Sequence, residues 1–531
     1  MNGTTIPAPS IEYGTLAPML LVFGAAIIGV LIEAFAPRYL RKSIHVPVTL
    51  LSLVGAFALI IFQVMASGVP TKAAAMGAIA VDGPSLFIWG VILVLSFVSV
   101  LLVMGDDHFV ASAAAVPGSA EEEDAETSGA AHTEVYPLVL FAVGGMLLFS
   151  AANDLLIMFV GLEVMSLPLY LLCGLARRRR LLSQEASMKY FLLGAFSSAF
   201  FLYGMALIYG YAGSVDLAKI NTALGSVGGM DTLLFAGLAL LGVGLMFKIG
   251  AAPFQAWKPD VYQGAPTPIT ALMASGTLVA AFGAVLRVFW VALGNLDWDW
   301  RPVMWGVAIL TMVVGAILAI TQTDIKRMLA YSSIAHAGFL LIGVIATNVD
   351  KVGPNGQVVE TAAAQNANSL SAIMFYLLVY GVTTVGAFAV VTMVRDAGGE
   401  AGHLSRWAGL GKRSPVLAGV FAFFLLAFAG IPLTSGFFGK YAIFIAAVEA
   451  GATPLVIVGV VTSAIAAFFY VRVIVLMFFS EPAADGPTIA IPSGATAAVI
   501  TLAAAVTVVL GVFPQPVLDL AEQAASTLFV R

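Results

Sequence analysis

The chain has 531 residues, of which 60% are hydrophobic and only 10% are charged, whereas soluble domains carry about 25% charged residues. With a mean hydropathy of +1.01, this composition excludes an ordinary soluble domain and indicates a polytopic membrane protein. The net charge of −5, the single Cys173 and the five scattered histidines argue against nucleic-acid binding, a disulfide, a metal site or a cysteine-ligated cluster in this chain.

Apolar runs of helix-spanning length, uncharged or with one charge, recur along the whole chain. We therefore expect an all-α membrane protein with about fourteen transmembrane helices and no soluble core of its own. The expected helices cover residues 15–36, 46–66, 84–104, 136–152, 155–176, 190–213, 232–255, 266–293, 302–323, 328–348, 369–394, 415–448, 454–480 and 490–515.

An acidic segment follows the first three expected helices, which form an N-terminal segment over residues 1–104. Residues 105–135 contain eight carboxylates, no lysine or arginine, and mostly small residues. Such a composition favours disorder. We expect a disordered cytoplasmic loop, either a solvated insertion or a contact for a partner subunit.

Loop charges predict the orientation, because cytoplasmic loops are enriched in lysine and arginine. With the N-terminus outside, the cytoplasmic loops hold fourteen such residues and the opposite side, tails included, holds five. We therefore expect both termini on the outer face. The fourteen are Arg38, Arg41, Lys42, Arg177, Arg178, Arg179, Arg180, Lys258, Lys326, Arg327, Arg395, Arg406, Lys412 and Arg413.

Two lysines each lie alone in a long uncharged run, close to residues that break helices. Lys248 is the only charge from Thr232 to Trp257 and is followed by Pro253, whereas Lys440 follows Pro432 and two glycines. An ammonium inside hydrocarbon costs roughly 2.5–3.5 kcal/mol. A broken helix supplies free backbone groups and room for water. The pattern predicts charge or proton movement within the bilayer.

Glu163 lies in the middle of another apolar run, and Lys248 is its natural partner. A Glu163–Lys248 pair can act as a switch, because the closed pair holds the lysine charged and the open pair leaves a desolvated amine that loses its proton. The alternative is a static packing ion pair.

Four further ionisable residues lie near or within the expected helices. His336 can relay protons, because imidazole titrates near neutral pH, or it can be a packing residue. Arg287 and Arg472 stay charged, so structural or field-setting roles are expected. Glu33 lies closer to a helix end and can be an interfacial acid.

Lys440, the second of the two lone lysines, has no acid within its own apolar run. A static ion pair is therefore harder to form there, which favours a proton relay.

Four motifs resemble the signatures of the antiporter-like proton-pumping subunits of bacterial NADH-quinone oxidoreductase, respiratory complex I, and within that family the subunit N type. They are Phe247–Pro268, Gly161–Glu163, Lys326–Ser333 and Gly430–Lys440. The resemblance implies two inverted five-helix repeats, helices four to eight and nine to thirteen, with helices seven and twelve interrupted. The repeats correspond to residues 136–293 and 302–480, and a C-terminal helix and tail occupy residues 490–531.

The resemblance also implies roles for individual residues. Glu163 and Lys248 match the coupled pair of the family, His336 matches a polar relay position, and Lys440 matches the outlet-side residue. These residues then form a pair of half-channels that translocate protons with the help of water, and the chain contacts other membrane subunits and the lipid bilayer of the bacterial inner membrane. NADH oxidation and quinone reduction, with their flavin and iron–sulfur clusters, belong to partner subunits.

The sequence departs from the family at one position. The family usually has a central lysine in helix eight, but Leu278 occupies that place, and Ile269–Trp290 contains no lysine or histidine. Thr270, Ser275 and Thr277 can order water there, although hydroxyls cannot store a proton at neutral pH. A longer water bridge is the expectation for this chain.

Several alternatives share these features. The nearest are another antiporter-like subunit of the same complex and a subunit of a multi-subunit cation/proton antiporter. A stand-alone secondary transporter would need a midplane pocket with convergent polar groups, which the sequence does not suggest. A structural scaffold with inert charges is the fourth reading.

Overall fold

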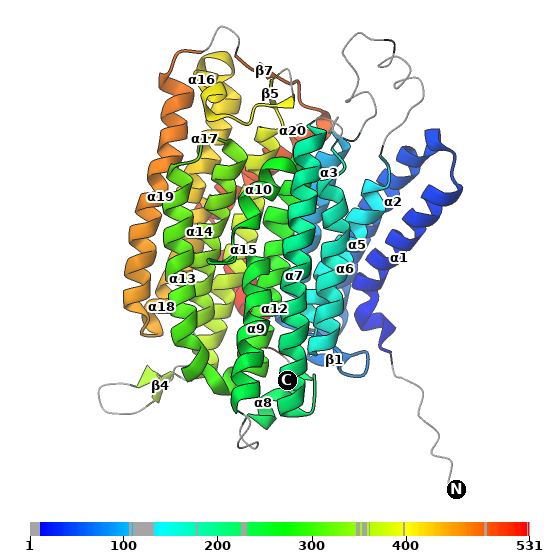
Figure 1. The fold of residues 1–531 in the computed structure, drawn as a ribbon, viewed down its shortest axis with the longest axis vertical. Coiled ribbons are helices and arrows are strands. Elements are labelled where there is room, and N and C mark those ends of the chain that lie inside the picture. The colour runs from blue at the N-terminus through cyan, green and yellow to red at the C-terminus, as the bar shows by residue number, and fades with distance from the viewer. Residues whose placement is uncertain are drawn as a thin grey trace.

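The computed structural model describes residues 11–105, 132–176, 179–224, 231–346, 351–352, 358–360, 362–396, 399–482 and 486–527, with positions 109, 120 and 529. This part of the chain is almost entirely helical (Figure 1). Residues 106–108, 110–119 and 121–131 of the predicted acidic loop lie outside the described residues, so the expectation of disorder there stays a prediction.

The first half of the chain forms helices α1 to α12. They are α1 (Tyr13–Phe35), α2 (Arg38–Ser67), α3 (Gly83–Met104), α5 (Val135–Ala151), α6 (Leu155–Cys173), α7 (Arg180–Ala212), α8 (Leu217–Ala223), α9 (Asp231–Ile249), α10 (Trp257–Gly264), α11 (Thr267–Leu272) and α12 (Leu278–Leu286). Two π-helical segments, Met273–Thr277 and Arg287–Ala292, continue α11 and α12 into one long buried helix.

The second half forms helices α13 to α21. They are α13 (Asp297–Ile320), α14 (Ile325–Ile345), α15 (Ala362–Val391), α16 (Leu410–Arg413), α17 (Pro415–Ala429), α18 (Ser435–Glu449), α19 (Thr453–Phe479), α20 (Gly494–Val512) and α21 (Gln515–Ser526). Short 3-10 turns lie at Gly294–Leu296 and Leu404–Trp407.

The described residues contain twelve helices long and apolar enough to cross a membrane, and α5 and α17 are shorter apolar helices. The expectation of a polytopic all-helical membrane protein is therefore confirmed. Each predicted apolar run overlaps a helix, and the number of passes stays a prediction. The amphipathic α21 was not predicted, because its 12 residues are too few to form a spanning run.

Short antiparallel strands connect some of the helices. β1 (Lys72–Ala74) pairs with β2 (Ile79–Val81), and β3 (Lys351–Val352) pairs with β4 (Val358–Glu360). A three-stranded sheet has the order β6 (Gly399–Glu400), β5 (Val394–Asp396), β7 (Thr488–Ile489). In Figure 1, α1 begins at the end of the bundle that holds β1, α8 and the C-terminus, and β5 and β7 lie at the opposite end.

Two of the long apolar runs are interrupted, as the prolines and glycines predicted. α9 ends at Ile249 and the chain becomes helical again at Trp257, and α17 ends at Ala429 and the chain becomes helical again at Ser435. Gly250 and Gly430 follow the two ends with φ of +73° and +83°. Glycine adopts this left-handed conformation without steric cost, which is why helices commonly end there.

Glycines allow two helix pairs to approach closely. A Cβ added to Gly145 of α5 would lie 2.3 Å from the backbone nitrogen of Met165 in α6, and one added to Gly315 of α13 would lie 2.4 Å from that of Ala335 in α14. Small residues at such crossings are how helices associate in lipid, where the hydrophobic effect does not drive them together. The α5–α6 and α13–α14 pairs therefore depend on these positions.

Replacing Gly315 with leucine should destabilise the subunit, because the side chain would meet the α14 backbone, which cannot move aside cheaply. Overpacking of this kind costs about 1–3 kcal/mol. The measurement is the midpoint of thermal unfolding of the purified complex. Gly306 of the same helix is the matched control, since an added Cβ there meets no described atom within 4 Å. Equal shifts for Gly315→Leu and Gly306→Leu would contradict this account of the crossing.

Candidate functional site

Lys248 lies at the C-terminal end of α9 and is 4% exposed. Its Nζ donates to Ser166 Oγ of α6 at 2.7 Å and to Tyr190 Oη of α7 at 3.3 Å. Both partners are neutral hydroxyls, which accept from an ammonium and can donate to an amine. The lysine is therefore hydrogen-bonded in either protonation state.

Glu163 lies one helical turn before Ser166 on α6. Its Oε1 atom is buried and has no hydrogen-bond partner among the described residues, and the carboxylate acts on Lys248 through space. The structure therefore brings the two predicted partners into one neighbourhood without a direct contact. The Ser166 hydroxyl accepts from Lys248 at the place where a closed pair would have a carboxylate, and the switch itself stays a prediction.

Lys440 extends from α18 toward the end of α17. Its Nζ donates to the carbonyl oxygens of Phe428 at 2.9 Å and Ala429 at 3.1 Å and to Ser463 Oγ at 2.8 Å, and it lies 4.8 Å from the centroid of the Phe339 ring. The carbonyls are free because α17 ends there. The broken helix thus supplies the acceptors that a buried ammonium needs.

His336 is buried in α14 between two tyrosines. Its Nδ1 lies 2.5 Å from Tyr376 Oη and its Nε2 lies 3.3 Å from Tyr470 Oη, and the ring of Tyr380 lies 4.6 Å away between centroids. The Tyr470 hydroxyl is also hydrogen-bonded to Ser332. The imidazole is therefore part of a network of groups that can exchange protons.

Two lysines that the sequence suggested were loop charges are buried in the bundle. Lys258 of α10 is 2% exposed, and its Nζ donates to the carbonyl oxygen of Ile249 at 2.7 Å and to Ser333 Oγ at 3.2 Å. Lys326 is also buried and lies 3.5 Å from Glu400. Sequence reasoning missed them because it assigned every lysine between apolar runs to a solvent-exposed loop. The helix break before Trp257 was the signal, since it draws α10 into the bundle.

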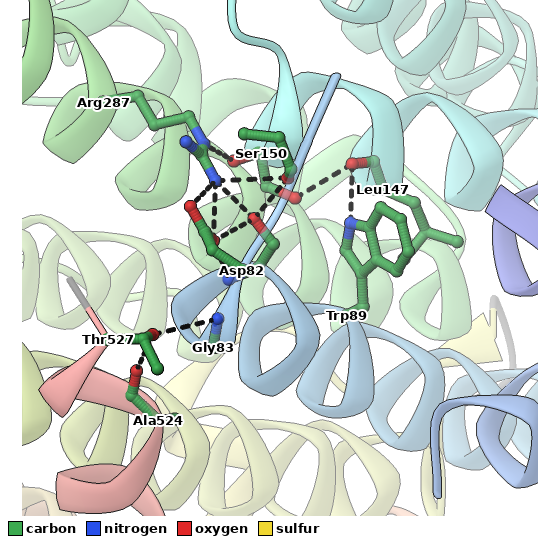
Figure 2. Close-up of polar contacts among 10 residues, drawn as sticks. Asp82, Gly83, Trp89, Leu147, Ser150, Arg287, Ala524 and Thr527 are labelled. Atoms are coloured by element: carbon green, nitrogen blue, oxygen red, sulfur yellow. Dashed lines mark hydrogen bonds and ion pairs between the residues drawn. The ribbon is translucent and has the colours of Figure 1, made fainter. Parts of the chain in front are cut away.

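Arg287 forms a buried ion pair with a residue that sequence reasoning did not single out. Its Nη2 donates to Asp82 Oδ1 at 2.9 Å and Oδ2 at 3.0 Å, and its Nε donates to the carbonyl oxygen of Ser150 at 3.0 Å. Figure 2 shows these groups gathered around the guanidinium, with Thr527 bonded to the backbone nitrogen of Gly83 nearby. The Asp82 carboxylate compensates the guanidinium charge, while Nη1 has no hydrogen-bond partner among the described residues, and the buried pair supports the structural reading of Arg287.

Arg472 and Glu33 lie away from this interior. Arg472 is exposed on the surface of α19, and its Nη1 donates to the carbonyl oxygen of Ile320 at 2.7 Å. Arg472 thus lies within a helix, as predicted, on a face of α19 that points away from the interior of the bundle. Glu33 accepts a hydrogen bond from Arg41 at 2.8 Å and joins α1 to α2.

The buried ionisable residues of the candidate site thus fall into two kinds. Lys248, Lys258, His336 and Lys440 are buried and bonded to hydroxyls, carbonyls or tyrosines, whereas Arg287 is bonded to a carboxylate. Groups of the first kind can lose a proton without leaving an unpaired carboxylate bonded to them. The described residues contain no group of three or more His, Cys, Asp or Glu side chains that could hold a metal ion.

A sequence profile of the family described as NADH:quinone oxidoreductase/Mrp antiporter, TM, matches residues 152–466. The chain is 60% identical to NADH-quinone oxidoreductase subunit N of Rhodococcus opacus, over 99% of this chain and 98% of the relative. The chain belongs to the subunit N family of NADH-quinone oxidoreductase. It is thus an antiporter-like membrane subunit of proton-pumping complex I, as the motifs predicted.

Two solved structures agree in fold. A chain of respiratory complex I from Thermus thermophilus with bound aureothin is 33% identical, with a TM-score of 0.73 over 94% of this chain and 98% of that one. A chain of the Mrp complex from Dietzia sp. has a TM-score of 0.79 over 98% of each chain at 22% identity, which shows the shared fold alone. The full-length relatives place this chain in complex I, with its other subunits as partners.

Replacing Asp82 with alanine should strongly destabilise the subunit. The change leaves the Arg287 guanidinium buried without its carboxylate, and breaking a buried pair in this way costs about 3–5 kcal/mol. The measurement is the thermal unfolding midpoint of the purified complex. Asp297→Ala is the control, since Asp297 and Arg301 form a partly exposed pair at 3.7 Å worth at most about 1 kcal/mol. Similar small shifts for both variants would contradict the structural importance of the buried pair.

Proposed function

We propose that this subunit translocates protons along a route that begins at Glu163 and Lys248, passes His336 and leaves past Lys440. One observation carries the proposal: the amines of Lys248 and Lys440 are buried in the bundle and hydrogen-bonded to neutral groups. A buried ammonium without a bonded carboxylate is only weakly favoured over the neutral amine. Small changes in wetting or in a nearby charge then decide whether each amine keeps its proton.

Glu163 supplies the movable counter-charge at the entrance of the route. Its carboxylate is close enough to act on Lys248, yet its buried Oε1 has no described hydrogen-bond partner. Rotation toward Lys248 favours the ammonium, and rotation away favours release of the proton toward Ser166 and Tyr190. Moving one charge against 150 mV takes about 3.5 kcal/mol, a cost that a change in the contacts of a buried ion pair can match.

A charged cavity offers an entrance from the cytoplasmic side. Its volume is about 130 Å³, and its lining includes Lys189, Asp260, Gln263 and Arg327. Asp260 accepts from Lys189 at 2.7 Å, and α10 leads from Asp260 inward to the broken helix. We place this cavity on the cytoplasmic side because the loop charges favour both termini on the outer face of the bacterial inner membrane.

His336 and Lys440 form the second half of the route. Phe428 connects them, because its ring packs 5.6 Å from the imidazole and its carbonyl oxygen accepts from Lys440. The tyrosine hydroxyls on both ring nitrogens allow the imidazole to take a proton on one side and release it on the other. Lys440 then passes the proton to the outer side.

The redox chemistry belongs to other subunits of the complex. With one cysteine, which is buried in α6, this chain cannot ligate an iron–sulfur cluster by thiolates alone. We assign the flavin, the clusters and quinone reduction to partner subunits. The energy reaches this chain as a conformational or electrostatic change at its contacts, and the two repeats over residues 136–293 and 302–480 provide the two half-channels.

Replacing Lys248 with methionine should reduce proton pumping several-fold, because a thioether of similar length fills the site but cannot carry a proton. The measurement is proton uptake by vesicles containing the purified complex while NADH oxidation drives it, after its subunit content has been verified. Lys412→Met, at an exposed ion pair with Glu481, should pump like the wild type. Normal pumping by an assembled Lys248→Met complex would contradict the proposed route.

A further inference from the structure

The two interrupted helices end in the same hydrogen-bond pattern. At the end of α9 the backbone nitrogen of Ala251 donates to the carbonyl oxygen of Met246 at 2.9 Å, and at the end of α17 that of Ile431 donates to Leu426 at 3.1 Å. Each bond spans five residues and closes around a glycine of positive φ, which is a Schellman motif. The motif fixes a residue-by-residue alignment, in which Gly250 corresponds to Gly430.

The alignment pairs Lys440 with a lysine other than Lys248. Ile249 and Ala429 are equivalent, and each carbonyl oxygen accepts from a lysine on the helix that follows the break. The donor is Lys258 at 2.7 Å in the first case and Lys440 at 3.1 Å in the second. Lys248 itself aligns with Phe428. With Lys258 as the counterpart of Lys440, a proline precedes the lysine in both halves: Pro253 precedes Lys258, and Pro432 precedes Lys440.

The two glycines also make room for the same side chain. A Cβ on Gly250 would lie 2.5 Å from Cδ of Lys258, and a Cβ on Gly430 would lie 3.1 Å from Cδ of Lys440. In both halves the lysine stem crosses the bare Cα of the glycine to reach the freed carbonyl. The two lysines therefore occupy one kind of site, built twice in the chain.

We propose that Lys258 is a further proton-carrying residue, the first half's counterpart of Lys440, and that it transfers protons from the Lys248 side to the second half through Ser333. The inference rests on the proposed function and adds a residue that its route lacks. Leu278 stands where a central lysine would be expected, and Lys258 supplies an amine from α10 instead.

The contacts of Lys258 connect the two halves. On one side Trp257, its neighbour in the chain, stacks on Tyr190 at 4.7 Å, and Tyr190 Oη is bonded to Lys248. On the other side Ser333 lies on α14, one turn before His336. The ring of Tyr380 packs against His336 at 4.6 Å between centroids and at a tilt of 32°. A proton that leaves Lys258 for Ser333 therefore arrives one helical turn from His336 and next to Ser332, which is hydrogen-bonded to Tyr470 of the His336 network.

The proton balance of the transfer is simple. The neutral amine of Lys258 accepts a proton delivered from the ammonium of Lys248 through hydroxyl groups and water, and Lys248 is left as an amine. The Lys258 ammonium then donates a proton toward Ser333 and the His336 network and returns to the amine. No other bond is made or broken, and no oxidant or reductant takes part.

A structural role is the competing explanation, in which Lys258 only caps the carbonyl oxygen of Ile249. Two substitutions separate the roles. Lys258→Gln keeps an N–H donor for that carbonyl but cannot carry a proton at neutral pH, and Lys258→Met removes both functions. A cap would be restored by glutamine, whereas a proton carrier would not.

The experiment measures proton uptake and NADH oxidation by the purified complex in vesicles. We expect assembled Lys258→Gln and Lys258→Met complexes to lose proton uptake several-fold, with Lys219→Met, at an exposed lysine of α8, unchanged. Wild-type uptake in Lys258→Gln would overturn the proposal. Lys248→Met is measured in parallel. If it loses uptake while both Lys258 variants retain it, only the role of Lys258 fails. If Lys248→Met itself pumps normally, the proposed function fails.

Discussion

The cost of burying an ammonium in a low-dielectric interior is the constraint on which the site depends. Lysine is rarely left unpaired in hydrocarbon, yet Lys258 and Lys440 are buried and bonded to no carboxylate among the described residues. Each lies where a helix stops and its last carbonyl groups are free. The helix break is therefore the device that makes a buried amine tolerable without fixing its charge. A glycine of positive φ follows the last helical residue, and because it has no side chain, the aliphatic part of the lysine can pack against its Cα.

A comparison with Arg287 shows why the kind of partner matters. Arg287 is as deeply buried, but Asp82 compensates its charge with two hydrogen bonds, and arginine does not release its proton. That pair holds α3 against the α12 region and stays charged. The lysines meet dipoles and hydroxyl groups instead, so their charged and neutral forms are closer in free energy. The interior of the bundle thus contains Arg287, whose permanent charge supports the fold, and buried lysines, whose charge can change during transport.

Much of this architecture could be predicted from the sequence, because the signals were local. Apolar runs predicted the helices, and the Gly-Pro patterns near Lys248 and Lys440 predicted the two interruptions. The features that the sequence did not reveal depend on contacts between residues that lie far apart in the chain. Lys258 and Lys326 were read as loop charges, since the sequence does not reveal that α10 turns into the bundle. Asp82 lies between apolar runs and gives no sign that Arg287, 205 residues away, is its partner. The switchable Glu163–Lys248 pair stays a prediction, and the sequence did not reveal that Ser166 lies at that amine.

The central claim is that the amines of Lys248 and Lys440 serve one continuous proton route. The most direct test compares proton uptake by the assembled Lys248→Met, Lys440→Met and Lys248→Met/Lys440→Met complexes, because steps of one serial route are not additive. The account predicts that the double variant loses no more uptake than the more affected single variant. Independent losses that add up in the double variant would mean that the two lysines serve separate routes, and would contradict the account.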